Sequence, residues 1–189
     1  MEKSNLENFF NEKVIEVLTK ELKTSNVMEI PKLTKIVLNM GLGDAKDNKN
    51  TLQQAVEELT IITGQKPVIR KSKKAISNFK IRQDDPVGVS VTLRKKKMYE
   101  FLERFIAIVS PRIRDFRGFS RNGFDGRGNY NFGITEQVVF PEINYDKVNA
   151  IRGLNLTFVT SAEDDISGFK LLNSFGFPFK DSSKNNNQD

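Results

Sequence analysis

The sequence predicts an α+β domain whose core is a split β-α-β-β-α-β antiparallel sheet of the ferredoxin-like or RRM-like kind, with both helices on one face. Alternating residue types over 87–94 predict a strand. Apolar residues at helical spacing over 51–63 and 96–109 predict two helices. An N-terminal helix and a long Gly- and Arg-rich loop are expected as additions. Because no repeat or long linker interrupts the chain, we expect a single domain over 1–180 and a disordered polar tail over 181–189.

The elements of the first half follow from local patterns. A helix is expected over 5–23, where apolar residues recur at helical spacing: Leu6, Phe10, Val14, Val17, Leu18 and Leu22. A strand is expected over 35–40, because apolar Ile36, Leu38 and Met40 alternate with Val37 and Asn39. The helix over 51–63 should end at Gly64, since glycine readily adopts the left-handed conformation of the residue that follows a helix. A short strand is expected over 67–71.

The second half contains the clearest strand, over 87–94. One face should carry Val87, Val89, Val91 and Leu93, and the other Gly88, Ser90, Thr92 and Arg94. The buried face of the 96–109 helix should consist of Met98, Phe101, Leu102, Phe105 and Val109, and Pro111 should limit that helix. We expect a long loop over 112–133, a strand over 154–160, and a final helix starting near Ser161, which has capping-box spacing to Asp164.

The composition excludes several classes of site. The chain has neither cysteine nor histidine, so disulfides, zinc sites built on these residues, and Ser-His-Asp or Cys-His catalytic groups are excluded. Acidic residues such as Asp84, Asp85 or Asp125 could hold Mg²⁺, but Asp84-Asp85-Pro86 is more typical of a turn. We therefore expect no enzyme, no catalytic residue, no metal and no cofactor. No apolar run reaches the ~20 residues of a membrane helix, and no apolar signal core begins the chain, which predicts a cytoplasmic protein.

The net charge of +6 is unevenly distributed. Between Lys66 and Arg127 there are 17 Lys/Arg and 6 Asp/Glu, a net charge of +11, whereas the remainder has a net charge of −5. This concentration favours a polyanionic partner. A solvated basic face without a partner and attachment to an anionic membrane surface are the alternatives. The cations lie largely in strands and loops and not on one amphipathic helix, which argues against the membrane.

Two groups of candidate contacts lie in and beside the predicted sheet. The polar face would carry Asn39, Ser90, Thr92, Arg94, Asn155 and Thr157. Their amide and hydroxyl groups can bond phosphates, 2′-hydroxyls and bases, although an antiparallel sheet can also leave a polar face simply solvated. The run 64–83 has no acidic residue, contains Phe79, and gathers the cations Lys66, Arg70, Lys71, Lys73, Lys74, Lys80 and Arg82. The cations of 94–97 extend this run.

A third group lies in the predicted loop over 112–133, with arginines at Arg112, Arg114, Arg117, Arg121 and Arg127. The loop is also rich in glycine, which allows tight turns near a partner. These glycines do not stand between a strand and a helix, so a P-loop or Rossmann site is rejected. The pair Gly41 and Gly43 does follow a predicted strand, but one such pair is weak support for a nucleotide site.

Long stretches of the chain resemble the bacterial large-subunit ribosomal protein five family, the 5S rRNA-binding ribosomal protein. They are KIVLNMGLGDA at 35–45, GQKPVIRKSKKAISNFKIRQ at 64–83, PVGVSVTLRKKKMYEFLERF at 86–105, PRIRDFRGFSRNGFDGRGNYNFGITEQVVFPEINYDK at 111–147, and FGFPF at 175–179. The resemblance implies a non-catalytic role on the ribosome. That role is to attach 5S rRNA to 23S rRNA in the central protuberance, beside neighbouring large-subunit proteins. It also implies contacts with P-site tRNA and small-subunit ribosomal protein thirteen. No membrane and no homo-oligomer are expected.

The resemblance also implies roles for residues. The surface for 5S rRNA would include Asn39, Gly41, Gln65, Thr92 and Arg94, to which residue type and position add Lys66 and Ser90. The loop from Arg70 to Lys80 would approach tRNA, with Phe79 at its hydrophobic position. The segment from Glu142 to Lys147, including Asn144 and Asp146, would face the small subunit.

Overall fold

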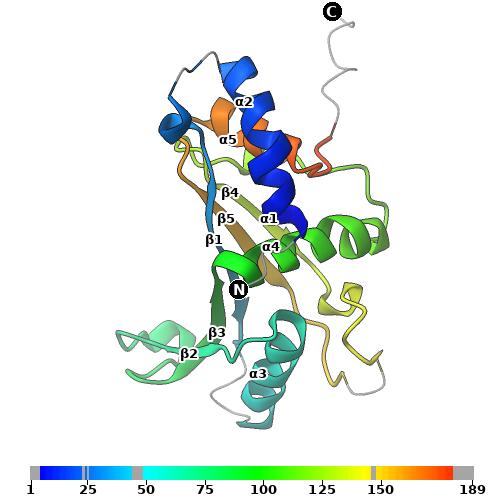
Figure 1. The fold of residues 1–189 in the computed structure, drawn as a ribbon. Helices are drawn as coiled ribbons and strands as arrows, with labels where there is room; N and C mark the ends of the chain where they lie inside the picture. Colours follow the sequence, from blue (N-terminus) through cyan, green and yellow to red (C-terminus); the bar gives the residue numbers. More distant parts are fainter. Residues whose placement is uncertain (1–4, 23, 25, 44–48, 146–147, 181–189) are drawn as a thin grey trace, which may run out of the picture. The chain divides into compact units, whose positions relative to one another are not determined.

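The computed structural model describes residues 5–22, 24, 26–43, 49–145 and 148–180. It confirms the α+β class, with helices and one sheet of strand order β2-β3-β1-β5-β4 (Figure 1). The ferredoxin-like connection of the sheet stays a prediction. The helices are α1 (Asn5–Phe9), α2 (Ile15–Leu22), α3 (Lys49–Thr63), α4 (Lys95–Arg104) and α5 (Asp165–Ser174). The strands are β1 (Leu33–Gly41), β2 (Val68–Lys71), β3 (Pro86–Leu93), β4 (Tyr130–Ile134) and β5 (Leu154–Thr160).

Contacts divide the chain into two compact units. Unit 1 contains Met1–Lys35, Arg94–Phe132 and Phe158–Asp189, and unit 2 contains Ile36–Leu93 and Gly133–Thr157. The expected single domain over 1–180 stays a prediction, and the expected tail over 181–189 lies outside the described residues. No helix in the described part of the chain is long and apolar enough to cross a membrane.

Unit 2 is built on three antiparallel strands. β1 pairs with β3, and β3 pairs with β2. The predicted alternation is confirmed in β1, where Ile36, Leu38 and Met40 are buried and Asn39 is exposed. Helix α3 packs against β3 and buries Ala55, Leu59 and Ile62. It ends, as expected, at Gly64, whose φ of +62° is the left-handed conformation that glycine adopts without strain.

Unit 1 is held together by aromatic rings. The Phe105 ring lies 5.4 Å from Phe132 and 6.1 Å from Phe177, and the Phe10 ring stacks 5.6 Å from Phe175. The predicted buried face of the 96–109 helix is confirmed, although its last turn, Phe105–Val109, is π-helical. The expected N-terminal helix likewise contains a π-helical turn, Phe10–Val14, between α1 and α2. This turn buries Phe10 and Val14.

Two sequence predictions in the second half of the chain were wrong in their bounds. The expected loop over 112–133 contains a 3-10 turn at Arg121–Gly123 and runs into β4. The last helix begins later than expected, because Asp164 caps α5 by accepting a hydrogen bond from the Ser167 N–H. The Ser161 hydroxyl instead accepts a hydrogen bond from the Lys32 N–H at 3.0 Å.

Candidate nucleic-acid interface

The polar positions of β1 and β3 come together in unit 2. The register places Asn39 opposite Ser90 and Val37 opposite Thr92. Side chains at directly opposed positions of two strands share a face of the sheet. Asn39 is exposed and Thr92 is half-buried, and the two occupy diagonally neighbouring positions of this face. This face presents both hydrogen-bond donors and acceptors, which suits contacts to the sugar-phosphate backbone and the bases of RNA.

Ser90 does not have the exposure expected of this face. Only 5% of its surface is exposed, because β2 lies along the outer side of β3 and places Val68 opposite Ser90. The Ser90 hydroxyl accepts a hydrogen bond of 2.7 Å from Nε of Arg70. This bond fixes the Nε end of the guanidinium group, and Arg70 is exposed. Ser90 therefore positions Arg70, and the cation is the group that remains available to a partner.

In the row of the sheet next to Asn39, two neighbouring positions lack a side chain. The register aligns Arg70, Gly88 and Gly41 across β2, β3 and β1. A Cβ at Gly88 would meet the Met40 carbonyl oxygen at 2.7 Å, so the approach of the two strands requires glycine there. A Cβ at Gly41 would meet nothing within 4 Å. The fold itself therefore gives no steric reason for glycine at 41, whereas the close approach of a partner would.

The loop after α3 brings two further predicted residues to this sheet. Gln65 donates from Nε2 to the Thr92 carbonyl oxygen at 3.3 Å. The loop is closed internally by Thr63, whose hydroxyl donates to the Leu59 carbonyl oxygen at 2.6 Å and accepts from the Gln65 N–H at 3.3 Å. Lys66 follows and is exposed. Gln65 is thus attached to the backbone of β3 at Thr92.

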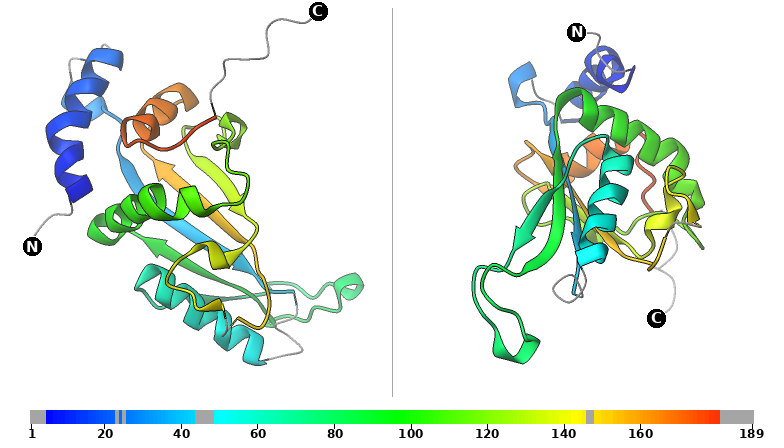
Figure 2. Two further views of the ribbon diagram at one scale, coloured as in Figure 1. Left: turned by 90° about the vertical axis from the view of Figure 1, so that its right-hand side faces the viewer. Right: turned by 90° about the horizontal axis from the view of Figure 1, so that it is seen from below.

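The basic run forms an extension between β2 and β3 that projects beyond the ends of these strands (Figure 2). Backbone hydrogen bonds close its base: the Ser72 N–H donates to the Asp85 carbonyl oxygen at 2.8 Å, and the Asp84 N–H to the Ser72 carbonyl oxygen at 3.0 Å. Near the tip, Ile76 and Ile81 form a β-bridge around the 3-10 turn Ser77–Phe79. The extension is therefore an ordered hairpin, here called the basic hairpin (72–85).

The tip of the basic hairpin combines apolar and cationic groups. Phe79 is 68% exposed and Ile76 is 45% exposed, which is unusual for large apolar residues. The cations that run from β2 into the hairpin are exposed as well: Arg70, Lys71, Lys73, Lys74, Lys80 and Arg82. Within the described residues, the side chains of Lys71, Lys73 and Lys74 form no ion pair. Exposed cations around an aromatic ring suit a folded polyanion better than solvent.

Arg94 and the arginines of 112–127 belong to unit 1, whereas the sheet residues Asn39 and Thr92 belong to unit 2. Arg94 stands immediately before α4, is exposed, and does not cap the helix with its side chain. The other five, also exposed, are Arg112, Arg114, Arg117, Arg121 and Arg127. Asp125 is the acid nearest the end of this segment. A hydrogen bond from the Asn129 side chain lowers the pKa of Asp125 below its usual value, and backbone N–H groups at 127 and 129 add to the effect.

The segment expected to face the small subunit is anchored to α3 within unit 2. Gln137 is fully buried and donates from Nε2 to the Ala150 carbonyl oxygen at 2.7 Å, while its Oε1 accepts from the Arg152 N–H. The Arg152 guanidinium lies 3.5 Å from the Glu58 carboxylate of α3. Burial raises the pKa of Glu58, although Arg152 and a hydrogen bond from Gln137 act to lower it. Both ends of the 137–152 segment are therefore fixed.

Of the three residues predicted in that segment, Glu142 is half-buried and Asn144 is exposed, while Asp146 lies outside the described residues. The sequence analysis did not identify Gln137 or Arg152. Neither residue belongs to a recognisable motif, and only the fold brings them to Glu58. Among the described residues, no group of three or more acidic side chains is placed to hold a metal ion.

Both halves of the chain match models of one protein family. The family model described as "Ribosomal protein L5" matches residues 26–82, and a second model, for the C-terminus of the same ribosomal family, matches residues 86–179. The large ribosomal subunit protein uL5 of Psychrobacter sp. (strain PRwf-1) is 55% identical over 94% of this chain and 99% of its own length. The uL5 proteins of Acholeplasma laidlawii and Geobacter sulfurreducens are each 54% identical, over 90% and 94% of this chain and 95% and 99% of their own.

Proposed function

The chain belongs to the ribosomal protein L5 family and is a structural, non-enzymatic component of the large ribosomal subunit, and from this premise we propose that its polar sheet face binds 5S rRNA. The single observation that carries the proposal is the row formed by Arg70, Gly88 and Gly41 beside exposed Asn39. A fixed cation flanks bare backbone, and amide and hydroxyl groups adjoin it. Such a surface allows a ribose-phosphate backbone to approach closely and to be hydrogen-bonded.

Electrophoretic mobility shift with 5S rRNA at graded salt tests this proposal. Phosphate contacts release counterions, so we expect log Kd to rise linearly with log salt. Asn39→Ala and Thr92→Val should weaken binding while circular dichroism stays unchanged. A matched control is Asn173→Ala, which removes an exposed amide from α5 in unit 1. Affinity that is independent of salt contradicts the proposed mechanism.

The basic hairpin is proposed to contact P-site tRNA. Lys73, Lys74, Lys80, Arg82 and the exposed Phe79 belong to this projecting hairpin, whereas Asn39 lies in β1. Replacing Lys71, Lys73 and Lys74 by Ala should leave 5S rRNA affinity nearly unchanged and weaken tRNA retention on ribosomes that carry the variant. A large loss of 5S rRNA affinity in this triple variant contradicts the proposal that 5S rRNA and tRNA bind different surfaces.

Two further contacts complete the proposal. The five arginines of 112–127 are proposed to bind ribosomal RNA, 23S rRNA among it, because they are exposed and close together in sequence.

The segment that includes Glu142 and Asn144 is proposed to face small-subunit ribosomal protein thirteen, supported by its anchoring through Gln137. Subunit reassociation with Asn144→Ala large subunits, assayed by sedimentation, tests the latter; unchanged reassociation contradicts it.

A further inference from the structure

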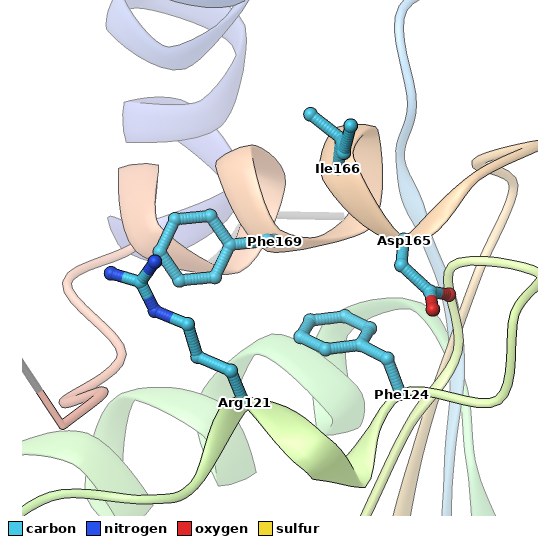
Figure 3. Close-up of a pocket in the computed structure, with 5 residues that line it drawn as sticks. All are labelled: Arg121, Phe124, Asp165, Ile166 and Phe169. Atoms are coloured by element: carbon cyan, nitrogen blue, oxygen red, sulfur yellow. The ribbon is translucent and has the colours of Figure 1, made fainter. Parts of the chain in front are cut away.

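A cavity of about 310 Å³ in unit 1 lies between the arginine-rich segment and the start of α5. Its lining consists of Arg121, Phe124, Asp165, Ile166 and Phe169. In Figure 3, Arg121 and Asp165 stand at opposite sides of the view, with the rings of Phe124 and Phe169 between them. The volume is at the lower end of the range of about 300–1,000 Å³ typical of small-ligand sites.

The aromatic walls of this cavity are supported from behind. The Phe124 ring lies 4.8 Å from the Tyr130 ring, and the Phe169 ring lies 4.8 Å from the Phe179 ring. Tyr130 and Phe179 are themselves 5.3 Å apart. Because the rings of Phe124 and Phe169 both pack against this aromatic cluster, they are held in place without a ligand. A preformed site of this kind loses little conformational entropy on binding.

Asp165 fixes the third side of the cavity. Its two carboxylate oxygens accept hydrogen bonds from the Gly128 N–H at 2.9 Å and the Gly126 N–H at 3.1 Å. The loop is so close to α5 that a Cβ at Gly168 would meet the Gly128 carbonyl oxygen at 2.5 Å. Each oxygen of an ionised carboxylate can accept more than one hydrogen bond. Asp165 is half-buried and can therefore also accept from a ligand.

Arg121 supplies charge at the other side. Its guanidinium carbon lies 4.3 Å from the centroid of the Phe169 ring, and the residue is exposed. In the portion of the chain that is described, its guanidinium donates no hydrogen bond and forms no ion pair. The remaining four arginines of 112–127 are exposed on the same segment. Arg121 is the cation that lines the cavity, and its charge favours an anionic group such as a phosphate beside it.

We propose that this cavity, the base pocket, receives one unpaired RNA base, with guanine preferred. The inference rests on the proposed RNA contact of the arginine-rich segment. A flat base would pack against the rings of Phe124 and Phe169, and its phosphate would meet Arg121. The Watson–Crick edge of guanine carries two adjacent N–H donors that match the Asp165 carboxylate. Uracil lacks the exocyclic amino group and should bind more weakly.

Titration of the full chain with guanosine 5′-monophosphate, followed by amide NMR signals, tests the pocket directly. We expect shifts centred on Gly126, Gly128 and Ile166, smaller shifts with uridine 5′-monophosphate, and none there with ribose 5-phosphate. Phe169→Leu should weaken guanosine monophosphate binding about tenfold, or about 1.4 kcal/mol. Arg121→Lys, which keeps the charge but loses the planar group, should also weaken it. The matched control is Phe9→Leu, which removes an exposed ring from α1, an element with no proposed RNA contact.

Equal shifts with ribose 5-phosphate, or none with the nucleotide, overturn the proposal. Chemical probing of rRNA in large subunits that carry Phe169→Leu provides a second test, in which one guanine or a few should lose protection. Unchanged reactivity of every rRNA nucleotide overturns the base pocket in favour of a side chain from a neighbouring protein. Because Phe169 lies in unit 1, its variant should retain 5S rRNA affinity through unit 2. A failed pocket is thereby distinguished from a failed 5S rRNA surface.

Discussion

Two glycines that face each other across β1 and β3 should respond oppositely to the same substitution. Gly41→Ala adds a Cβ that meets nothing within 4 Å, and Gly41 does not have a positive φ. The free energy of unfolding should stay the same or rise by about 0.4–1 kcal/mol, because alanine restricts the unfolded chain. Gly88→Ala puts a Cβ 2.7 Å from the Met40 carbonyl oxygen. Such overpacking should cost about 1–3 kcal/mol.

Binding to 5S rRNA should separate the two variants further. If RNA lies against the bare row, the Gly41→Ala methyl group intrudes on the contact, and we expect affinity to fall at least tenfold in a well-folded protein. Urea unfolding gives the stability of each variant, and a mobility shift at fixed salt gives its affinity. A Gly41→Ala protein that is stable and binds 5S rRNA like the parent refutes the idea that RNA approaches this row. A Gly88→Ala protein of unchanged stability refutes the steric argument for β1 and β3.

Three other variants test individual groups. Asn39→Ala should lower 5S rRNA affinity by about 1 kcal/mol, roughly fivefold, with unfolding unchanged; an unfolded variant would mean that the amide is structural. Glu58 has a pKa raised above 4.5, so its contribution to stability is present below that pH and is lost as pH rises through the folded-state pKa. The stability of the parent relative to Glu58→Gln should therefore fall from pH 4 to pH 7; a rise would mean that the attraction to Arg152 outweighs burial. Burial raises the pKa of Tyr130 to about 12, and its hydroxyl donates to the Ser120 carbonyl oxygen at 2.6 Å. Tyr130→Phe should cost about 1 kcal/mol of stability and remove the tyrosine that ionises near pH 12 in an absorbance titration; an unchanged titration contradicts the assignment.

The sequence predicted best where one periodicity ran uninterrupted. Strand β5 was predicted with its observed bounds, because its alternation had no competing pattern. Strand β4 was missed because its five residues, YNFGI, include asparagine and glycine within a glycine-rich stretch. The start of α5 was predicted too early, since Ser161 has the spacing of a cap but is engaged by Lys32, a residue far away in sequence.

The candidate interface was predictable in composition but not in detail. The sequence showed which cations and polar residues would gather, and exposure of the cations from Lys66 to Arg82 agrees with it. It could not show that Arg70 bonds Ser90, because that bond depends on the pairing of β2 with β3. The base pocket could not be predicted from the sequence either. Phe169 and Arg121 are 48 positions apart, and neither carries a motif.

The closure of the basic hairpin bears on how this protein tolerates change. The bonds that join Ser72 to Asp84 and Asp85 involve backbone atoms alone, so they do not depend on which side chains follow them. Lengthening, shortening or recharging the tip should leave the pairing of β2 with β3 in register. The tip should accordingly be exchangeable, and grafting a tip of different length or charge onto this stem should alter the proposed tRNA contact while the sheet stays unchanged.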